Sequence, residues 1–199
     1  SISNVTLRDD SLWNLTGDSN LTNLVNDPSR ILFSAPVNGA FKTLTVVNYV
    51  GEGQSLIGLN TVVEGDGSPS DKLVIDGGSA TGQSQLAITN VGGRGALTRA
   101  NGILVVDTIG GGTTVPAAFV LAGSVAAGPY TYTLARGSRD GSNDQAWYLR
   151  STVDAPAVLL RHARLHRSHR RLRHRHLGLP ARYLLARNLD IYVVHVLSK

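Results

Sequence analysis

The sequence predicts an all-β protein made of short strands and tight turns. Glycine accounts for 22 of the 199 residues and aromatic residues for 6%, whereas a helical protein would be richer in Leu and Ala. Hydrophobic residues make up 42%, which is enough to build a core. Up to residue 152, apolar runs alternate with Gly, Asn, Asp and Ser, and hardly any stretch keeps a helical period for about ten residues.

Eight segments of ordinary strand length follow from these runs. They are residues 42–48, 55–61, 72–76, 85–90, 103–107, 118–122, 130–136 and 146–150. Several of them share an apolar-x-apolar pattern followed by Asn or Asp and then Gly. The pattern occurs at Leu44, Val46, Asn48 and Gly51, at Leu86, Ile88, Asn90 and Gly92, at Ile103, Val105, Asp107 and Gly110, and in shortened form at Leu73, Ile75, Asp76 and Gly77. Alternation puts the aliphatic pair on one face, and Asn or Asp with Gly supplies the positive φ of a sharp turn.

The spacing of these strands is irregular. The first aliphatic residues of the four patterns are separated by 29, 13 and 17 residues, which fits neither an up-and-down barrel nor a regular propeller. A parallel β-solenoid tolerates such insertions at its corners. An antiparallel β-sandwich would show similar strands and turns, so the pattern leaves both folds open.

The composition changes abruptly near Thr152. Residues 1–152 carry nine Lys and Arg against twelve Asp and Glu, whereas residues 153–199 carry ten against two, together with all six His. Of the 22 glycines, only Gly178 lies in the second part. We therefore expect two units, a β-rich segment over residues 1–152 and a basic His/Arg-rich tail over residues 153–199. The first residues lack a leader pattern, so we expect a piece of a larger protein.

Specific residues narrow the choice of fold. Eight short matches, in order and at similar spacing, occur at residues 11–14 (SLWN), 21–24 (LTNL), 41–46 (FKTLTV), 71–75 (DKLVI), 80–82 (ATG), 119–121 (FVL), 128–134 (GPYTYTL) and 147–151 (WYLRS). Through them the chain resembles the C-terminal passenger region of pertactin-like autotransporters of the type V secretion pathway. The resemblance spans about 140 residues.

The resemblance implies a right-handed parallel β-helix with a C-terminal hairpin that caps one end. It also implies an autochaperone, a non-enzymatic stalk segment that folds early during outer-membrane translocation and templates the coils of the passenger of an adhesin or virulence factor. Its partners would be the rest of its own passenger and a C-terminal translocator barrel, with any host receptor bound through a more N-terminal part. The implied location is the Gram-negative cell surface, the outer membrane or the medium, reached through the periplasm, and we expect a monomer.

The residues expected to carry this role are those that make the last coil a stable cap. They are Tyr130, Tyr132 and Leu134 on one strand and Trp147, Tyr148 and Leu149 on the next, joined by a turn at residues 140–143. Alternation places Trp147 with Leu149 on one face of its strand. Buried aromatic residues supply a large contact area, so in a folding nucleus the core packing is the function.

We expect no catalytic, cofactor or metal site. The chain has no Cys, and residues 17–20 (GDSN) resemble an esterase motif but no His precedes His162, which leaves the serine without a base. Asp66, Asp71 and Asp76 could suggest a calcium site, but solvated turn carboxylates are the favoured interpretation. The formal glycosylation sequons at Asn4, Asn14 and Asn20 are interpreted as members of Asn and Thr ladders. A carbohydrate-active β-helix enzyme is the alternative from another class.

The tail departs from the resemblance, which predicts a linker, a helix and a barrel after residue 151. Its Arg, His, Leu, Ala and Pro composition is typical of GC-rich DNA translated in a shifted frame, and a frameshift is the favoured interpretation. A disordered basic tail without a specific partner, an arm that binds nucleic acid or anionic lipid, and metal binding through His162 and His166 or His174 and His176 are the alternatives.

Overall fold

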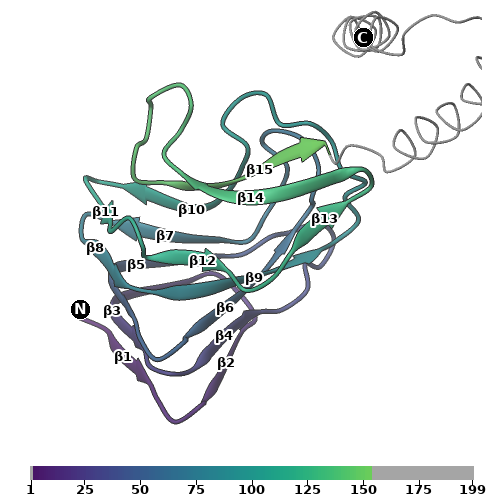
Figure 1. The fold of residues 1–199 in the computed structure, drawn as a ribbon. Helices are drawn as coiled ribbons and strands as arrows, with labels where there is room; N and C mark the ends of the chain where they lie inside the picture. Colours follow the sequence, from purple (N-terminus) through teal and green to yellow (C-terminus); the bar gives the residue numbers. More distant parts are fainter. Residues whose placement is uncertain (1, 154–199) are drawn as a thin grey trace, which may run out of the picture. The chain divides into compact units, whose positions relative to one another are not determined.

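The chain forms two β-sheets and passes back and forth between them (Figure 1). The computed structural model describes residues 2–153, and all statements below refer to this range. The ten-stranded sheet contains β1 (Asn4–Leu7), β3 (Ser19–Asn26), β5 (Thr43–Gly51), β7 (Lys72–Asp76), β8 (Ser79–Gly82), β10 (Ile103–Ile109), β11 (Thr113–Thr114), β13 (Val125–Ala127), β14 (Tyr130–Arg136) and β15 (Trp147–Val153). The five-stranded sheet contains β2 (Leu12–Leu15), β4 (Arg30–Phe33), β6 (Leu56–Thr61), β9 (Ser84–Asn90) and β12 (Phe119–Leu121).

Parallel pairing dominates both sheets. The larger sheet runs in the order β1-β3-β5-β7-β10-β15-β14-β13, and the smaller one in the order β12-β9-β6-β4-β2. Among the described strands only three pairs are antiparallel: β13 with β14, β14 with β15, and β15 with β10, through which the hairpin joins the stack. The prediction of an all-β chain is confirmed. The parallel pairing excludes the antiparallel sandwich and is compatible with a solenoid.

Each rung is one turn of the chain that contributes strands to both sheets. The number of residues per rung increases along the chain. In the larger sheet Asn4 lies opposite Asn23, Ser19 opposite Leu44, Thr43 opposite Lys72 and Leu73 opposite Val106, offsets of 19, 25, 29 and 33 residues. The stack is therefore narrow at β1 and β2 and wider toward β10 (Figure 1). Corners absorb the extra residues while the strands keep their register.

The core lies between the two sheets and consists of stacked side chains from successive rungs. The larger sheet stacks Leu44, Leu73 and Val106, and the smaller one stacks Trp13, Ile31, Ile57, Leu86 and Leu121. The inward positions predicted for Leu44, Leu73 and Leu86 are confirmed. In β10 the predicted alternation fails, because Val105 and Val106 are both buried and Val106, not Val105, lies opposite Leu73, where the register shifts between Leu104 and Val106. The irregular spacing in the sequence also has its cause here, because Leu86 belongs to the smaller sheet while the other three patterns belong to the larger one.

Three of the four predicted corner glycines adopt positive φ, namely Gly77 (+76°), Gly92 (+96°) and Gly110 (+58°). The prediction for Gly51 is wrong, because Gly51 ends β5 and the positive φ falls on Gly53 (+57°). Gly51 is needed for a different reason. A Cβ at this position would lie 2.0 Å from Oγ of Ser84 in the next rung.

All eight predicted strands are present, with ends that shift by up to three residues. Seven further strands were missed: β1, β2, β3, β4, β8, β11 and β13. Most of these are short, and β1 to β3 carry Asn, Ser or Thr among their apolar residues, which weakens the apolar signal.

The two ends of the stack differ. We call the end that carries β13, β14 and β15 the hairpin end, and the end formed by β1 and β2 the open end. At the open end β1 and β2 are the outermost strands of their sheets, so one edge of each lacks a partner among the described residues. No helix within residues 2–153 is long and apolar enough to span a bilayer. The predictions for residues 154–199 lie outside the described residues.

Candidate functional site

Trp147 fixes the hairpin to the wall of the stack. Its side chain is only 4% exposed and packs edge-to-face against Phe119 of β12, with 5.5 Å between ring centroids. Its indole Nε1–H donates to Thr114 Oγ1 at 3.0 Å, and this hydroxyl donates to the Gln145 carbonyl oxygen at 2.7 Å. Arg136 of β14 also donates to Thr114 Oγ1, at 3.1 Å. One threonine thus connects the short strand β11 to both strands of the hairpin.

Tyr132 anchors the opposite side of the hairpin. It is 1% exposed, and its hydroxyl donates to the Glu64 carbonyl oxygen at 2.8 Å and accepts from the Ala96 N–H at 3.0 Å. Burial raises the pKa of the Tyr132 hydroxyl above its ordinary value. The hydroxyl therefore stays protonated and serves as a structural hydrogen-bond partner for two loops.

A reciprocal pair, Thr98 and Ser151, fastens the loop over residues 91–102 to β15. The Thr98 N–H donates to Ser151 Oγ at 2.7 Å, and the Ser151 N–H donates to Thr98 Oγ1 at 2.9 Å. Gly95 in the same loop has φ +79°, and a Cβ there would lie 1.9 Å from the carbonyl oxygen of Ala127 in β13. The close approach requires glycine at this position.

The six predicted cap residues fall into two groups. Trp147, Leu149 and Tyr132 belong to the buried core cluster, and Tyr130 and Leu134 are partly buried against it. Tyr148 is also buried but points to the opposite face, where the Arg150 guanidinium lies 5.7 Å from its ring centroid. The geometry therefore brings five of the six side chains to one core. Sequence reasoning missed Thr114, Thr98 and Ser151, because polar pairs that meet across 33 and 53 residues leave no local pattern.

The turn predicted at residues 140–143 forms the tip of a longer connection. Strand pairing ends at Arg136 and Trp147, which leaves residues 137–146 outside the ladder. Asp140 organises the tip by accepting from the Ser142 hydroxyl at 2.6 Å and the Ser142 N–H at 3.0 Å. These hydrogen bonds, with one from Asn101, hold the pKa of Asp140 far below its usual range.

Asp66 holds the loop over residues 91–102 at its far end. Its carboxylate accepts from the backbone N–H groups of Arg99, Ala100 and Gly102 at 2.7, 3.0 and 2.8 Å. Burial by itself raises the pKa of Asp66, but the three N–H groups together outweigh it and lower the pKa below the ordinary value. The ionised carboxylate therefore stabilises this loop.

The interpretation of Asp71 as a solvated turn carboxylate is wrong. Asp71 is fully buried and accepts from the Lys42 N–H at 2.7 Å and from the Asn60 N–H at 2.9 Å. Its neighbours in sequence occupy other places, since Asp76 is exposed at the end of β7 and Asp66 binds the loop described above. Within residues 2–153 no three His, Cys, Asp or Glu side chains are grouped so that they could hold a metal ion.

Residues 17 and 18 of the GDSN segment form the corner between β2 and β3, and the other two residues belong to β3. Asp18 accepts from the Thr43 N–H of the next rung at 2.8 Å, and Ser19 begins β3. These are structural contacts between rungs.

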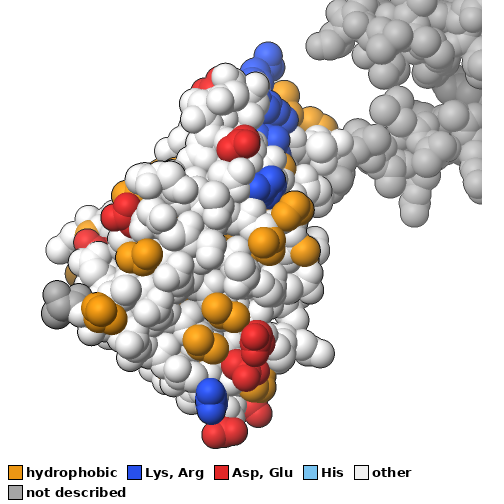
Figure 2. Space-filling model, turned by 90° about the vertical axis from the view of Figure 1, so that its left-hand side faces the viewer, with side chains coloured by type: hydrophobic (Ala, Val, Ile, Leu, Met, Phe, Trp, Pro, Cys, Tyr) orange, Lys and Arg blue, Asp and Glu red, His pale blue; other side chains and the backbone are white. Residues whose placement is uncertain are grey.

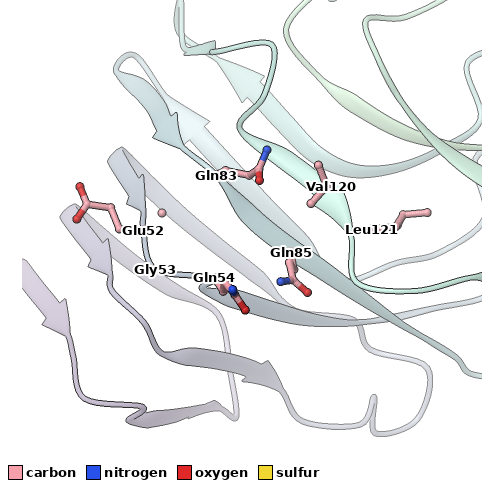
Figure 3. Close-up of a pocket in the computed structure, with 8 residues that line it drawn as sticks. Glu52, Gly53, Gln54, Gln83, Gln85, Val120 and Leu121 are labelled. Atoms are coloured by element: carbon pink, nitrogen blue, oxygen red, sulfur yellow. The ribbon is translucent and has the colours of Figure 1, made fainter.

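A surface groove of 640 Å³ follows a corner of the stack across three rungs (Figure 3). Its lining residues are Gly51, Glu52, Gly53, Gln54, Gln83, Gln85, Val120 and Leu121. Gln54 and Gln85 lie close together, while Glu52 lies apart at the corner (Figure 3). The groove offers amides and one carboxylate, whereas glycoside hydrolysis generally uses a pair of carboxyl groups.

Charge is unevenly distributed along the stack. Residues 2–91 carry four Lys and Arg against nine Asp and Glu, and residues 92–153 carry five Arg against three Asp. Figure 2 shows Lys and Arg gathered toward the hairpin end of one face and Asp and Glu toward the open end. Three of these arginines are structural: Arg136, Arg139 and Arg150 donate to the carbonyl oxygens of Thr114, Thr98 and Asn101 at 2.8, 3.2 and 3.0 Å.

Comparison with known proteins identifies the chain. A family profile described as autochaperone domain type 1 matches residues 19–134, more than half of the sequence. The chain belongs to this autochaperone family. The match covers strands β3 to β13 and most of β14, and it ends before β15.

Several curated relatives are autotransporters. The chain is 42% identical over 112 residues to the autotransporter adhesin AIDA-I of Escherichia coli, and 37% identical over 162 residues to the probable autotransporter YfaL of E. coli K12. It is 46% identical over 109 residues to the uncharacterized protein YuaQ of E. coli K12. These matches cover 56%, 71% and 55% of the chain but only 8%, 12% and 7% of the relatives. The chain thus spans about a tenth of the length of these relatives.

Proposed function

We propose that residues 2–153 form a right-handed parallel β-helix whose hairpin end nucleates folding of an autotransporter passenger during outer-membrane translocation. The observation that carries the proposal is the difference between the two ends. The hairpin end is closed by three antiparallel strands that bury Trp147, Leu149 and Tyr132, whereas the open end exposes the edges of β1 and β2. Folding of a solenoid can nucleate at any rung and propagates by contacts between neighbouring rungs, so the most stable rungs are the favoured starting place, and the hairpin end offers them.

The proposed role needs no catalytic chemistry and no energy source besides folding. Membership of the family implies a Gram-negative outer-membrane or cell-surface location, and the segment would support an adhesin, as in AIDA-I. We propose a non-enzymatic, monomeric stalk segment whose partners are the rest of its own passenger and a translocator barrel. A host receptor would be bound elsewhere in the protein, and nucleic acid is not a specific partner.

Surface display of a full-length autotransporter that contains this segment tests the nucleation role. Trp147→Ala with Leu149→Ala should leave barrel insertion intact while the passenger becomes protease-sensitive or poorly displayed. Supplying the wild-type segment separately should restore passenger folding. The chain offers a matched control in Trp13→Ala with Leu15→Ala, the same residue types two apart in β2 at the open end. Protease resistance of the first variant equal to wild type would refute the proposal.

A further inference from the structure

A ladder of asparagine side chains runs up the outer face of the larger sheet toward the open end. Asn4, Asn23 and Asn48 lie opposite one another in β1, β3 and β5. Asn48 Nδ2 donates to Asn23 Oδ1 at 2.9 Å, and Asn23 Nδ2 donates to Asn4 Oδ1 at 2.7 Å. The ladder predicted for the sequon residue Asn4 is confirmed, whereas Asn14 and Asn20 make no such side-chain bond within the described residues.

The ladder has a fixed polarity. At its inner end Asn48 Oδ1 accepts from the backbone N–H of Ser79 at 3.3 Å. A backbone N–H can only donate, so the Asn48 oxygen faces Ser79 and its NH₂ group must face Asn23. The same argument orients Asn23 toward Asn4. The last NH₂ group, Asn4 Nδ2, therefore points out of the open end and has no acceptor among the described residues.

Within residues 2–153, the apolar residues at the open end also lack packing partners on the side that faces away from the next rung. Val5 and Trp13 are only half-buried, whereas the residues opposite them in the next rung, Leu24 and Ile31, are fully buried. Leu12 of β2 is 49% exposed. Unpaired strand edges beside an uncovered apolar stack are a template for another strand of the same kind.

We propose that Asn4 sets the register in which a preceding rung of the same passenger docks on β1 and β2. The docking strand carries a side-chain acceptor, Asn or another short oxygen-bearing residue, directly opposite Asn4. This inference rests on the proposed function and names the side chain at the open end that determines how the next rung aligns. The inter-rung interface already present between β1 and β3 would simply continue by one rung.

Register needs such a device because the edge alone does not determine it. A slip by one residue would turn the apolar side chains outward and is excluded by the core. A slip by two residues keeps the apolar face inward, so the core penalises it far less. The donor of Asn4 distinguishes these registers, because only one of them places an acceptor within hydrogen-bond distance.

An extended chain tests the proposal. A second copy of residues 4–22 is inserted directly before Asn4 of the 199-residue chain, so the copied Asn precedes Asn4 by the 19 residues that separate Asn4 from Asn23. Three further versions change the copy alone. Two of them replace the copied Asn4 by Asp or by Ala, and the third adds two residues between the end of the copy and the original Asn4. Hydrogen exchange of the β1 backbone amides reports docking, and light scattering reports the mass.

We expect the Asn and Asp copies to slow exchange in β1, and the Ala copy to lose about 2- to 12-fold of that protection, the range for one hydrogen bond. Equal protection by the Ala copy would refute the register role of Asn4 while leaving rung docking and the proposed function intact. No protection by any copy would overturn both. A doubled mass of the unextended chain with protected β1 amides would mean that a second copy, not a preceding rung, occupies the edge.

Discussion

Replacing Trp147 by alanine should destabilise the hairpin end more than most single substitutions in the stack. The side chain is 4% exposed, contacts Phe119 edge-to-face at 5.5 Å and donates to Thr114 at 3.0 Å. Loss of a buried tryptophan costs about 3–5 kcal/mol. In a chain of this size each kcal/mol lowers the melting temperature by about 2–4 °C, so the expected decrease is about 6–20 °C.

Trp147→Phe separates the two contributions to this loss. The phenyl ring keeps most of the contact with Phe119 but loses the indole N–H, and Thr114 Oγ1 still has Gln145 and Arg136 as partners. The expected cost is therefore about 0.5–1.5 kcal/mol. Circular dichroism melts of both variants measure the difference. Equal melting temperatures for the Ala and Phe variants would refute the claim that the buried volume of Trp147 holds the hairpin.

Further predictions concern the contacts around the hairpin. Tyr132→Phe removes a hydroxyl that serves two loops and should lower stability by about 1–3 kcal/mol in urea unfolding. Gly95→Ala should destabilise far more than Gly141→Ala, since both have positive φ but only Gly95 faces a backbone oxygen, at 1.9 Å; equal effects would contradict this. The lowered pKa of Asp66 means that its contribution to stability is present above about pH 4 and is lost as the pH falls through the folded-state pKa. The urea midpoint should therefore fall less on acidification in Asp66→Asn than in wild type. A chain that ends at Val153 should keep a cooperative β-rich melt, because β15 completes its pairing there.

The sequence was most informative where one face of a strand is apolar. Leu44, Leu73 and Ile103 each begin an apolar-x-apolar pattern and all lie in the core, so period-two reading located their strands. Strand β1 was missed although Val5 and Leu7 alternate with Asn4 and Thr6, because it has only four residues and two apolar positions carry the whole pattern. The family resemblance located the hairpin, and aromatic alternation placed Trp147 with Leu149.

What the sequence could not supply are contacts between distant polar groups. Thr114 meets Trp147, and Thr98 meets Ser151, only because the fold brings β15 beside β11 and beside the loop over residues 91–102. The sequence around Asp71 predicts an exposed turn residue, yet its carboxylate is buried and accepts hydrogen bonds from the backbone N–H groups of Lys42 and Asn60. No local pattern distinguishes a buried turn carboxylate from a solvated one.

The central claim is that folding starts at the hairpin end, and folding kinetics of a matched pair test it most directly. Leu149 in β15 and Leu24 in β3 are the same residue type and are both fully buried, at opposite ends of the stack. Alanine at either site should cost about 2–5 kcal/mol. If the hairpin end is the nucleus, Leu149→Ala should slow refolding by about 10- to 60-fold for a loss of 3 kcal/mol, whereas Leu24→Ala should mainly accelerate unfolding. Slower refolding of Leu24→Ala with unchanged refolding of Leu149→Ala would place the nucleus at the open end and contradict the account.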